Sequence, residues 1–244
     1  MFIVEKEPKS VAAESYRSLR TGIQYSSFDK KYKTILITSS EPGEGKSTTS
    51  ANLALSLVQS GKKVILIDCD MRRPSVHKAF RISDTQGISD VLVGNVKLED
   101  SIVKSGELYI LTAGSIPPNP SEMLESNAMT ELLDRLKEEY DYVIIDSPPV
   151  QAVTDSQVLS TKVDATILVI KVEKTKKESV RNSIKLLKQV NANIIGTVLN
   201  GIDTKRSNYY YYYSNEDNEK HRKHRKGNRF KKRKKYSENE MVVQ

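Results

Sequence analysis

Residues 34–48 read Thr-Ile-Leu-Ile-Thr-Ser-Ser-Glu-Pro-Gly-Glu-Gly-Lys-Ser-Thr, and this stretch decides the fold. An aliphatic and β-branched run at 34–38 passes directly into a loop with Gly43 and Gly45, and helical spacing follows Lys46. Glycines let the backbone turn so that its N–H groups converge on phosphate oxygens, and a helix that starts there adds the positive end of its dipole. The stretch therefore predicts a strand, a phosphate-binding loop and a helix.

The loop also predicts the cofactors, ATP and Mg²⁺. Lys46 would reach the β- and γ-phosphates as a point charge, and Ser47 would offer its hydroxyl to Mg²⁺. The strict G-x₄-G-K-[ST] pattern fails at its first position, where Ser40 stands. The alternative is a glycine-rich turn that only caps a helix. The predicted nucleotide contacts are Pro42, Gly43, Glu44, Gly45, Lys46, Ser47 and Thr48.

Further apolar runs extend the pattern along the chain. They lie at 63–67, 108–112, 142–145, 165–171 and 194–199, and they are continuous rather than alternating, as expected for strands covered on both faces. Segments with helical spacing lie at 10–25, 47–60, 121–139 and 175–190. Strands that alternate with helices predict an α/β fold with a mostly parallel sheet and helices on both faces.

Three aspartates follow two of these runs. Asp68 and Asp70 come after the run at 63–67, and Asp146 comes after the run at 142–145. Parallel strands bind ligands at their carboxyl ends, so these side chains are expected beside the loop. Mg²⁺ needs only one or two carboxylates near Ser47, which leaves one for proton chemistry. A single aspartate at such a place would more simply form a turn, and Asp155 is expected to cap the next helix rather than bind the metal.

The net charge of +8 is concentrated at one end of the chain. Residues 205–244 hold 13 Lys or Arg and 5 Asp or Glu, so the rest is neutral. This excludes a uniformly basic nucleic-acid-binding domain, and specific nucleic-acid binding is not expected. The basic stretch 220–235 is an expected contact for an anionic membrane surface. One cysteine, Cys69, and the lack of a long apolar run predict a cytosolic protein.

The three motifs resemble the Walker A, Walker A′ and Walker B set of the bacterial tyrosine kinases. The resemblance is to the stand-alone cytoplasmic kinases of Gram-positive capsular and exopolysaccharide synthesis, which have a P-loop NTPase fold. Residues 65–72, Ile-Leu-Ile-Asp-Cys-Asp-Met-Arg, look like the A′ motif, and Pro117–Leu124 also looks like a family segment. Glu14, Arg17 and Arg20 are similar to the oligomerisation motif E-x₂-R-x₂-R; by spacing alone they would be a solvated helix face.

The resemblance implies roles for these residues. Lys46, Asp68, Asp70 and Arg72 would be catalytic, with Asp68 as the base. Ser47, Asp68 and Asp146 would form the metal set. Asn200 would contact adenine, although a turn role for Asn-Gly is equally open.

The resemblance also implies domains and partners. Residues 1–30 would form an oligomerisation region, 31–204 a kinase domain and 205–244 a disordered, basic, tyrosine-rich tail. The partners would be further copies in a ring, a membrane-embedded activator and a tyrosine phosphatase. The protein would lie in the cytoplasm, at the inner face of the membrane through a partner.

The tail suggests the phosphate acceptors. Six of the 12 tyrosines lie there, and five adjacent ones cannot all face a core. They are Tyr209, Tyr210, Tyr211, Tyr212, Tyr213 and Tyr236. The alternative is an aromatic patch for self-association.

Two other functions stay open on the sequence. A partition or positioning ATPase shares the loop but carries a lysine five residues before Lys46, where this chain has Glu41. A structural adaptor would bind nucleotide without turning it over.

Overall fold

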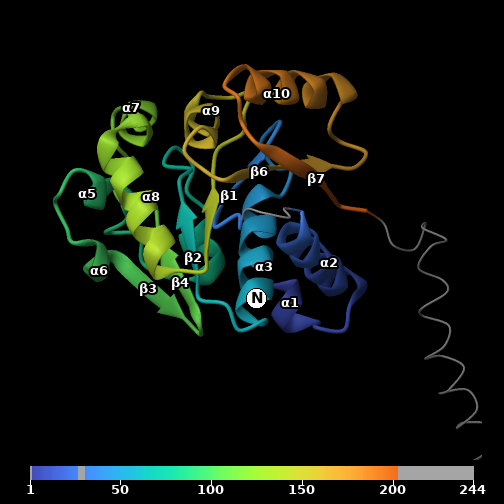
Figure 1. The fold of residues 1–244 in the computed structure, drawn as a ribbon, viewed down its shortest axis with the longest axis horizontal. Helices are drawn as coiled ribbons and strands as arrows, with labels where there is room; N and C mark the ends of the chain where they lie inside the picture. Colours follow the sequence, from blue (N-terminus) through green and yellow to red (C-terminus); the bar gives the residue numbers. More distant parts are fainter. Residues whose placement is uncertain (1, 27–30, 203–244) are drawn as a thin grey trace, which may run out of the picture. The chain divides into compact units, whose positions relative to one another are not determined.

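A computed structural model describes residues 2–26 and 31–202 of the 244-residue chain. They form a seven-stranded sheet in the order β3-β4-β2-β5-β1-β6-β7 (Figure 1). All neighbouring strands of this sheet are parallel except β3 and β4. The strands are β1 (Thr34–Ser39), β2 (Val64–Asp68), β3 (Ile102–Ser105), β4 (Leu108–Leu111), β5 (Tyr142–Asp146), β6 (Ala165–Lys171) and β7 (Ile194–Asn200). The six predicted strands are confirmed, and β3 was not predicted.

The helices are α1 (Ile3–Lys6), α2 (Val11–Tyr25), α3 (Lys46–Val58), α4 (Val76–Phe80), α5 (Ile88–Leu92), α6 (Leu98–Ser101), α7 (Pro120–Glu125), α8 (Asn127–Glu139), α9 (Asp155–Ser160) and α10 (Lys177–Gln189). One helix prediction is wrong: 121–139 is two helices. Ser126 is extended, with φ −56° and ψ 159°, and its hydroxyl accepts a hydrogen bond from the N–H of Met129. Ser126 therefore ends α7 and caps α8.

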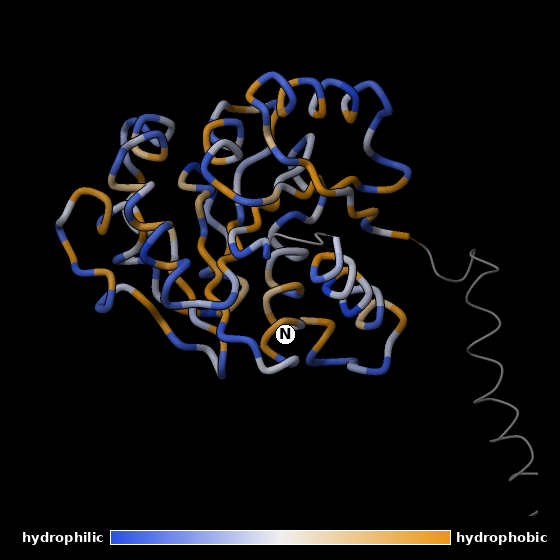
Figure 2. Tube along the Cα trace, in the orientation of Figure 1, coloured by the Kyte–Doolittle hydropathy of each residue, from blue (hydrophilic) through white to orange (hydrophobic). Residues whose placement is uncertain are grey.

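The strands β1, β2, β5 and β6 are buried on both faces along most of their length, as the continuous apolar runs predict. The prediction is wrong for the edge strand β7, which is partly exposed. On one face Ile35 and Ile37 pack in a core with α1, α2 and α3, and on the other Leu36 packs with α5, α8 and α9. This alternation follows from the two-residue period of a strand. Figure 2 shows the same division, with apolar strands inside and many hydrophilic positions along the helices.

The strand order places the functional ends of three strands side by side. β5 lies between β2 and β1, and the Cα of Asp68 is paired in register with that of Asp146. The loop after β1 therefore meets both aspartates at one edge of the sheet.

The chain divides into two units, Met1–Gly201 and Ile202–Gln244, and this architecture is that of the first. The predicted disordered tail lies outside the described residues. Within the described part of the chain, none of the helices combines the length and the apolar character that a membrane span requires.

Candidate active site

The loop between β1 and α3 is shaped by two glycines. Gly43 has φ 77° and Gly45 has φ 96°, a left-handed region that side chains disfavour. A Cβ at Gly45 would lie 1.9 Å from Nδ2 of Asn200. The loop therefore requires glycine at both positions, and α3 begins directly after it at Lys46.

Asn200, predicted to contact adenine, lies against the loop itself. Its Nδ2 donates a hydrogen bond to the backbone oxygen of Glu44 at 2.9 Å. This contact connects the end of β7 to the loop.

A buried carboxylate holds the loop from inside. Oε2 of Glu44 accepts hydrogen bonds from the N–H groups of Ser40 and Glu41, at 2.8 and 3.1 Å. Oε1 of Glu44 accepts from the hydroxyl of Thr175, and the side chain is almost fully buried. Glu44 thus fixes the turn that begins at Ser40, the position where the strict G-x₄-G-K-[ST] pattern has glycine.

Lys46 lies at the centre of the site. Its Nζ is 2.8 Å from Oδ2 of Asp70 and 3.7 Å from Oδ2 of Asp146. Burial lowers the pKa of Lys46, but the negative charges of Asp146 and Asp70 outweigh it, so the pKa is raised. The ammonium group therefore stays charged within the loop.

Asp68 is a buried carboxylate tied to the backbone that follows it. Its Oδ2 accepts from the N–H groups of Ser75 and Val76, both at 2.9 Å, and its Oδ1 accepts from Asp70 at 3.1 Å. Burial raises the pKa of Asp68 to about 7, and the charge of Asp146 adds to the effect. A carboxyl group with this pKa is suited to accept a proton near neutral pH.

Asp146 and Ser47 fit the predicted metal site. Burial raises the pKa of Asp146, and its Oδ1 accepts from the hydroxyl of Ser50 at 3.2 Å. Its buried Oδ2 has no hydrogen-bond partner in residues 2–26 and 31–202. The hydroxyl of Ser47 lies 2.8 Å from that of Ser75, which donates to it. Among the described residues, no group of three or more Asp, Glu, His or Cys side chains has the arrangement to hold a metal ion. A Mg²⁺ ion would therefore also need water or phosphate oxygens.

Arg72 binds Asp155. Its Nε and Nη2 atoms lie 2.9 and 3.1 Å from the two carboxylate oxygens, and the bond to Asp155 raises the pKa of Arg72. The Ser121 hydroxyl donates to the same carboxylate. The expectation that Asp155 caps α9 is wrong, because Thr154 is the N-cap residue and Asp155 joins the A′ loop to α7 and α9.

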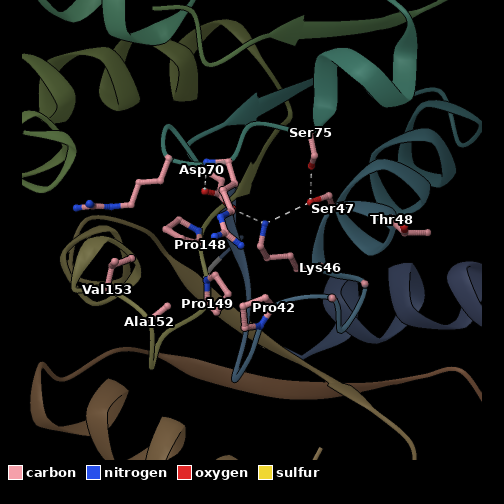
Figure 3. A pocket seen from close by; sticks show the side chains of 14 residues that line it. Pro42, Lys46, Ser47, Thr48, Asp70, Ser75, Pro148, Pro149, Ala152 and Val153 are labelled. Atoms are coloured by element: carbon pink, nitrogen blue, oxygen red, sulfur yellow. Dashed lines mark hydrogen bonds and ion pairs between the residues drawn. The ribbon is translucent and has the colours of Figure 1, made fainter. Parts of the chain in front are cut away.

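Some of these residues, among them Lys46, Ser47 and Asp70, line a cavity of about 510 Å³. One wall is the loop with Lys46 and Ser47, and the other holds Pro148, Pro149 and Val153 (Figure 3). Its remaining lining residues are Pro42, Gly43, Gly45, Thr48, Asp70, Arg72, Arg73, Ser75 and Ala152. Asp68 is fully buried and is not one of the lining residues, but its carboxylate accepts hydrogen bonds from the N–H groups of Asp70 and Ser75, which are.

The predicted oligomerisation residues are on α2, away from the loop. Arg17 pairs with Glu14 at 2.6 Å, and Arg20 donates to the backbone oxygen of Ser56 on α3 at 2.6 Å. Glu14 is exposed, whereas Arg17 and Arg20 are half-buried. The motif therefore makes contacts within its own chain as well as offering an exposed acid.

The structure thus brings Lys46, Ser47, Asp68, Asp70 and Asp146 together, as predicted. The six tail tyrosines lie outside the described residues. Sequence reasoning missed the clamp made by the Glu44 side chain, the contacts of Ser75 and the partner of Arg72. An acid inside a phosphate-binding loop was the one signal that pointed to a structural clamp.

Known proteins share this arrangement over most of the chain. The AAA domain family matches residues 32–199. The tyrosine-protein kinase YwqD of Bacillus subtilis is 44% identical over 218 residues, which cover 88% of this chain and 92% of that protein. The chain belongs to the bacterial tyrosine kinases. The kinase domain of the Escherichia coli tyrosine kinase ETK superposes with a TM-score of 0.82 and 34% identity, covering 85% of this chain and 82% of that one.

A more distant likeness is to the septum site-determining protein MinD of Pyrococcus horikoshii, complexed with Mg-ADP. The TM-score is 0.59 at 28% identity, covering 68% of this chain and 69% of that chain. Both the TM-score and the identity are lower for this positioning ATPase than for the kinase domain of ETK. The comparisons confirm the predicted P-loop NTPase fold and the predicted tyrosine-kinase activity.

Proposed function

We propose that this kinase transfers the γ-phosphoryl group of ATP to the tail tyrosines Tyr209–Tyr213 and Tyr236 of a second copy, and thereby regulates capsular or exopolysaccharide synthesis and export. The observation that carries the proposal is the charged loop lysine, Lys46, set between Asp70 and Asp146 on the wall of an open cavity. Phosphoryl transfer depends mainly on positioning and charge neutralisation, and this arrangement supplies both.

The transfer step follows from these groups. The phenolic oxygen attacks the γ-phosphorus, the bond from that phosphorus to the β–γ bridging oxygen breaks, and ADP leaves. The phenolic proton would pass to Asp68, the base that the family resemblance implies, while Lys46 engages Asp70. Ser47 and Asp146 would hold a magnesium ion, which would supply charge neutralisation on the triphosphate. Lys46 and the N–H groups of the loop hold the phosphates in line.

The test uses the full chain with ATP and Mg²⁺. Lys46→Met is expected to abolish phosphate on the tail, read by phosphopeptide mass spectrometry, while the exposed Lys188→Met on α10 retains it. Phosphate on the tail of the Lys46→Met chain, incubated alone at the rate of the parent, would refute the assignment. A mixture in which an active chain modifies the Lys46→Met chain would support transfer between copies.

The positioning ATPase is not favoured by any contact in the site. Its additional lysine is replaced by Glu41, whose carboxylate accepts a hydrogen bond from Ser179 at 2.6 Å. Release of free phosphate without tail modification would favour this alternative, and neither product would favour the adaptor.

The partners form part of the same proposal. We place the ring contacts at Glu14, Arg17 and Arg20, and propose a membrane-embedded activator and a tyrosine phosphatase as further partners. The kinase would then lie at the inner face of the membrane, with the basic stretch 220–235 facing anionic lipid.

A further inference from the structure

The cavity is lined by three cationic side chains, and two of them already have acidic partners. Lys46 pairs with Asp70, and Arg72 pairs with Asp155. The third, Arg73, is exposed, and its guanidinium makes no ion pair or hydrogen bond with any residue of 2–26 and 31–202. An unpaired arginine at the rim of an active site is available to an anion that arrives with the substrate.

The backbone of Arg73 is fixed beside the reaction centre. Its N–H donates to Oδ1 of Asp70 at 3.0 Å and lies 3.2 Å from the backbone oxygen of the same residue. Oδ2 of Asp70 is the atom that pairs with Lys46. The guanidinium therefore starts from a rigid turn and projects from a point next to the phosphate-binding lysine.

The tail carries its acidic residues in a matching pattern. All five acids of 205–244 follow a tyrosine at short spacing, and none precedes the block of five. The spacings are three, four and six residues after Tyr213, and two and four residues after Tyr236. The acids are Glu216, Asp217, Glu219, Glu238 and Glu240. Three or four residues of extended chain span about 10–14 Å, a length suited to join a tyrosine in the cavity to an anchor at its rim.

We propose that Arg73 is a specificity-determining residue, which binds the acidic side chain three or four positions after the acceptor tyrosine. The inference rests on the proposed transfer to the tail and adds the sequence that the site selects. A guanidinium binds a carboxylate with two parallel hydrogen bonds, which give both direction and charge complementarity. Arg73 positions the acceptor and takes no part in the bond changes.

This recognition implies an order of modification. Tyr213 has Glu216 three positions on, so it is modified early. Its phosphate then carries about −1.5 to −2 charge and stands three positions after Tyr210. Tyr212 also has an acid, Glu216, four positions on. The phosphate on Tyr213 supplies the anion for Tyr210 and Tyr209, three and four positions before it. Tyr211 has Ser214 and Asn215 at these spacings and is modified last.

The experiment separates the kinase chain from the acceptor chain. The kinase is the full chain with all six tail tyrosines changed to Phe, and the acceptor is the full Lys46→Met chain. A second acceptor also carries Glu216→Gln, Asp217→Asn and Glu219→Gln. Initial rates are followed for each tyrosine by mass spectrometry, with Arg73→Ala in the kinase and with Arg181→Ala, an exposed arginine of α10 outside the cavity lining, as the matched control.

Neutralising the acids is expected to lower the rate roughly three- to tenfold, the range of one exposed or partly exposed charge pair. Arg73→Ala should give a similar loss on the parental acceptor and no further loss on the neutral one, with the KM for ATP unchanged. The control should match the parent. Two results would overturn the inference while leaving the proposed function intact. The first is an equal rate of the parental kinase on both acceptors. The second is a combined loss, for the Arg73→Ala kinase on the neutral acceptor, that equals the product of the two separate losses. Absence of phosphate on every acceptor would overturn the proposed function and the inference with it.

Discussion

The pair between Arg72 and Asp155 gives an asymmetric prediction about stability. Asp155 is fully buried, whereas the side chain of Arg72 is 40% exposed. Arg72→Met leaves a buried carboxylate without its counter-charge, and breaking such a pair costs about 3–5 kcal/mol. We expect about 3 kcal/mol, since the hydroxyl of Ser121 still donates to Asp155.

The reverse change, Asp155→Asn, is expected to cost about 1 kcal/mol, because water reaches the guanidinium that is left and the amide can still accept one hydrogen bond. The two variants should therefore differ by about 2 kcal/mol in the free energy of unfolding, measured by urea denaturation. The double variant should be less destabilised than Arg72→Met, since it no longer buries an unpaired charge. Arg135→Met removes an exposed arginine with two exposed carboxylate partners, Glu99 and Glu139, and should leave stability unchanged. An Asp155→Asn variant as unstable as Arg72→Met would refute the reasoning.

Three further predictions address the loop, the acid stability and the metal. Gly45→Ala forces an unfavourable backbone angle and a clash with Asn200, so it should weaken the binding of a fluorescent ATP analogue at least tenfold; unchanged binding would show that the loop can rearrange. Burial raises the pKa of Asp164, but hydrogen bonds from Thr34 outweigh this effect, so the pKa is lowered. The ionised carboxylate therefore stabilises the fold above the ordinary carboxyl pKa, and this stabilisation is lost as the pH falls through the lowered value. Asp164→Asn should flatten the acid limb of a plot of melting temperature against pH. Removing divalent ions with EDTA should stop tail phosphorylation, and added Mg²⁺ should restore it; activity that persists in EDTA would contradict the roles given to Ser47 and Asp146.

Most of the sheet could be predicted because its central strands are buried on both faces. Continuous apolar runs mark β1, β2 and β4–β7, and parallel strands bring their carboxyl ends to one edge. That rule places Asp68 and Asp146 together although 78 residues separate them, and the register confirms it. β3 escaped prediction because Ile102–Ser105 is short and only half-buried. The break at Ser126 escaped because the apolar spacing continues across it.

The rest of the site could not be predicted, because it depends on contacts between segments that share no pattern. The sequence has no pattern that indicates an ion pair between Arg72 and Asp155, which lies 83 positions further along the chain. The inward turn of Glu44 depends on Thr175, which follows the neighbouring strand β6 and lies 131 positions further along the chain. Such contacts follow from the packed structure, whereas the roles of the loop lysine and the strand-end aspartates follow from local chemistry.

The crowding of Asp68, Asp70 and Asp146 around one ammonium group has a consequence for the lifetime of the protein. Burying more negative than positive charge disfavours the native state, and a bound cation such as Mg²⁺ would relieve this cost. Ligands that bind only the native state add stability in proportion to the logarithm of their concentration. The abundance of this protein would therefore follow the energy supply of the cell: in starvation, when the nucleotide is scarce, more molecules unfold and become targets of proteases.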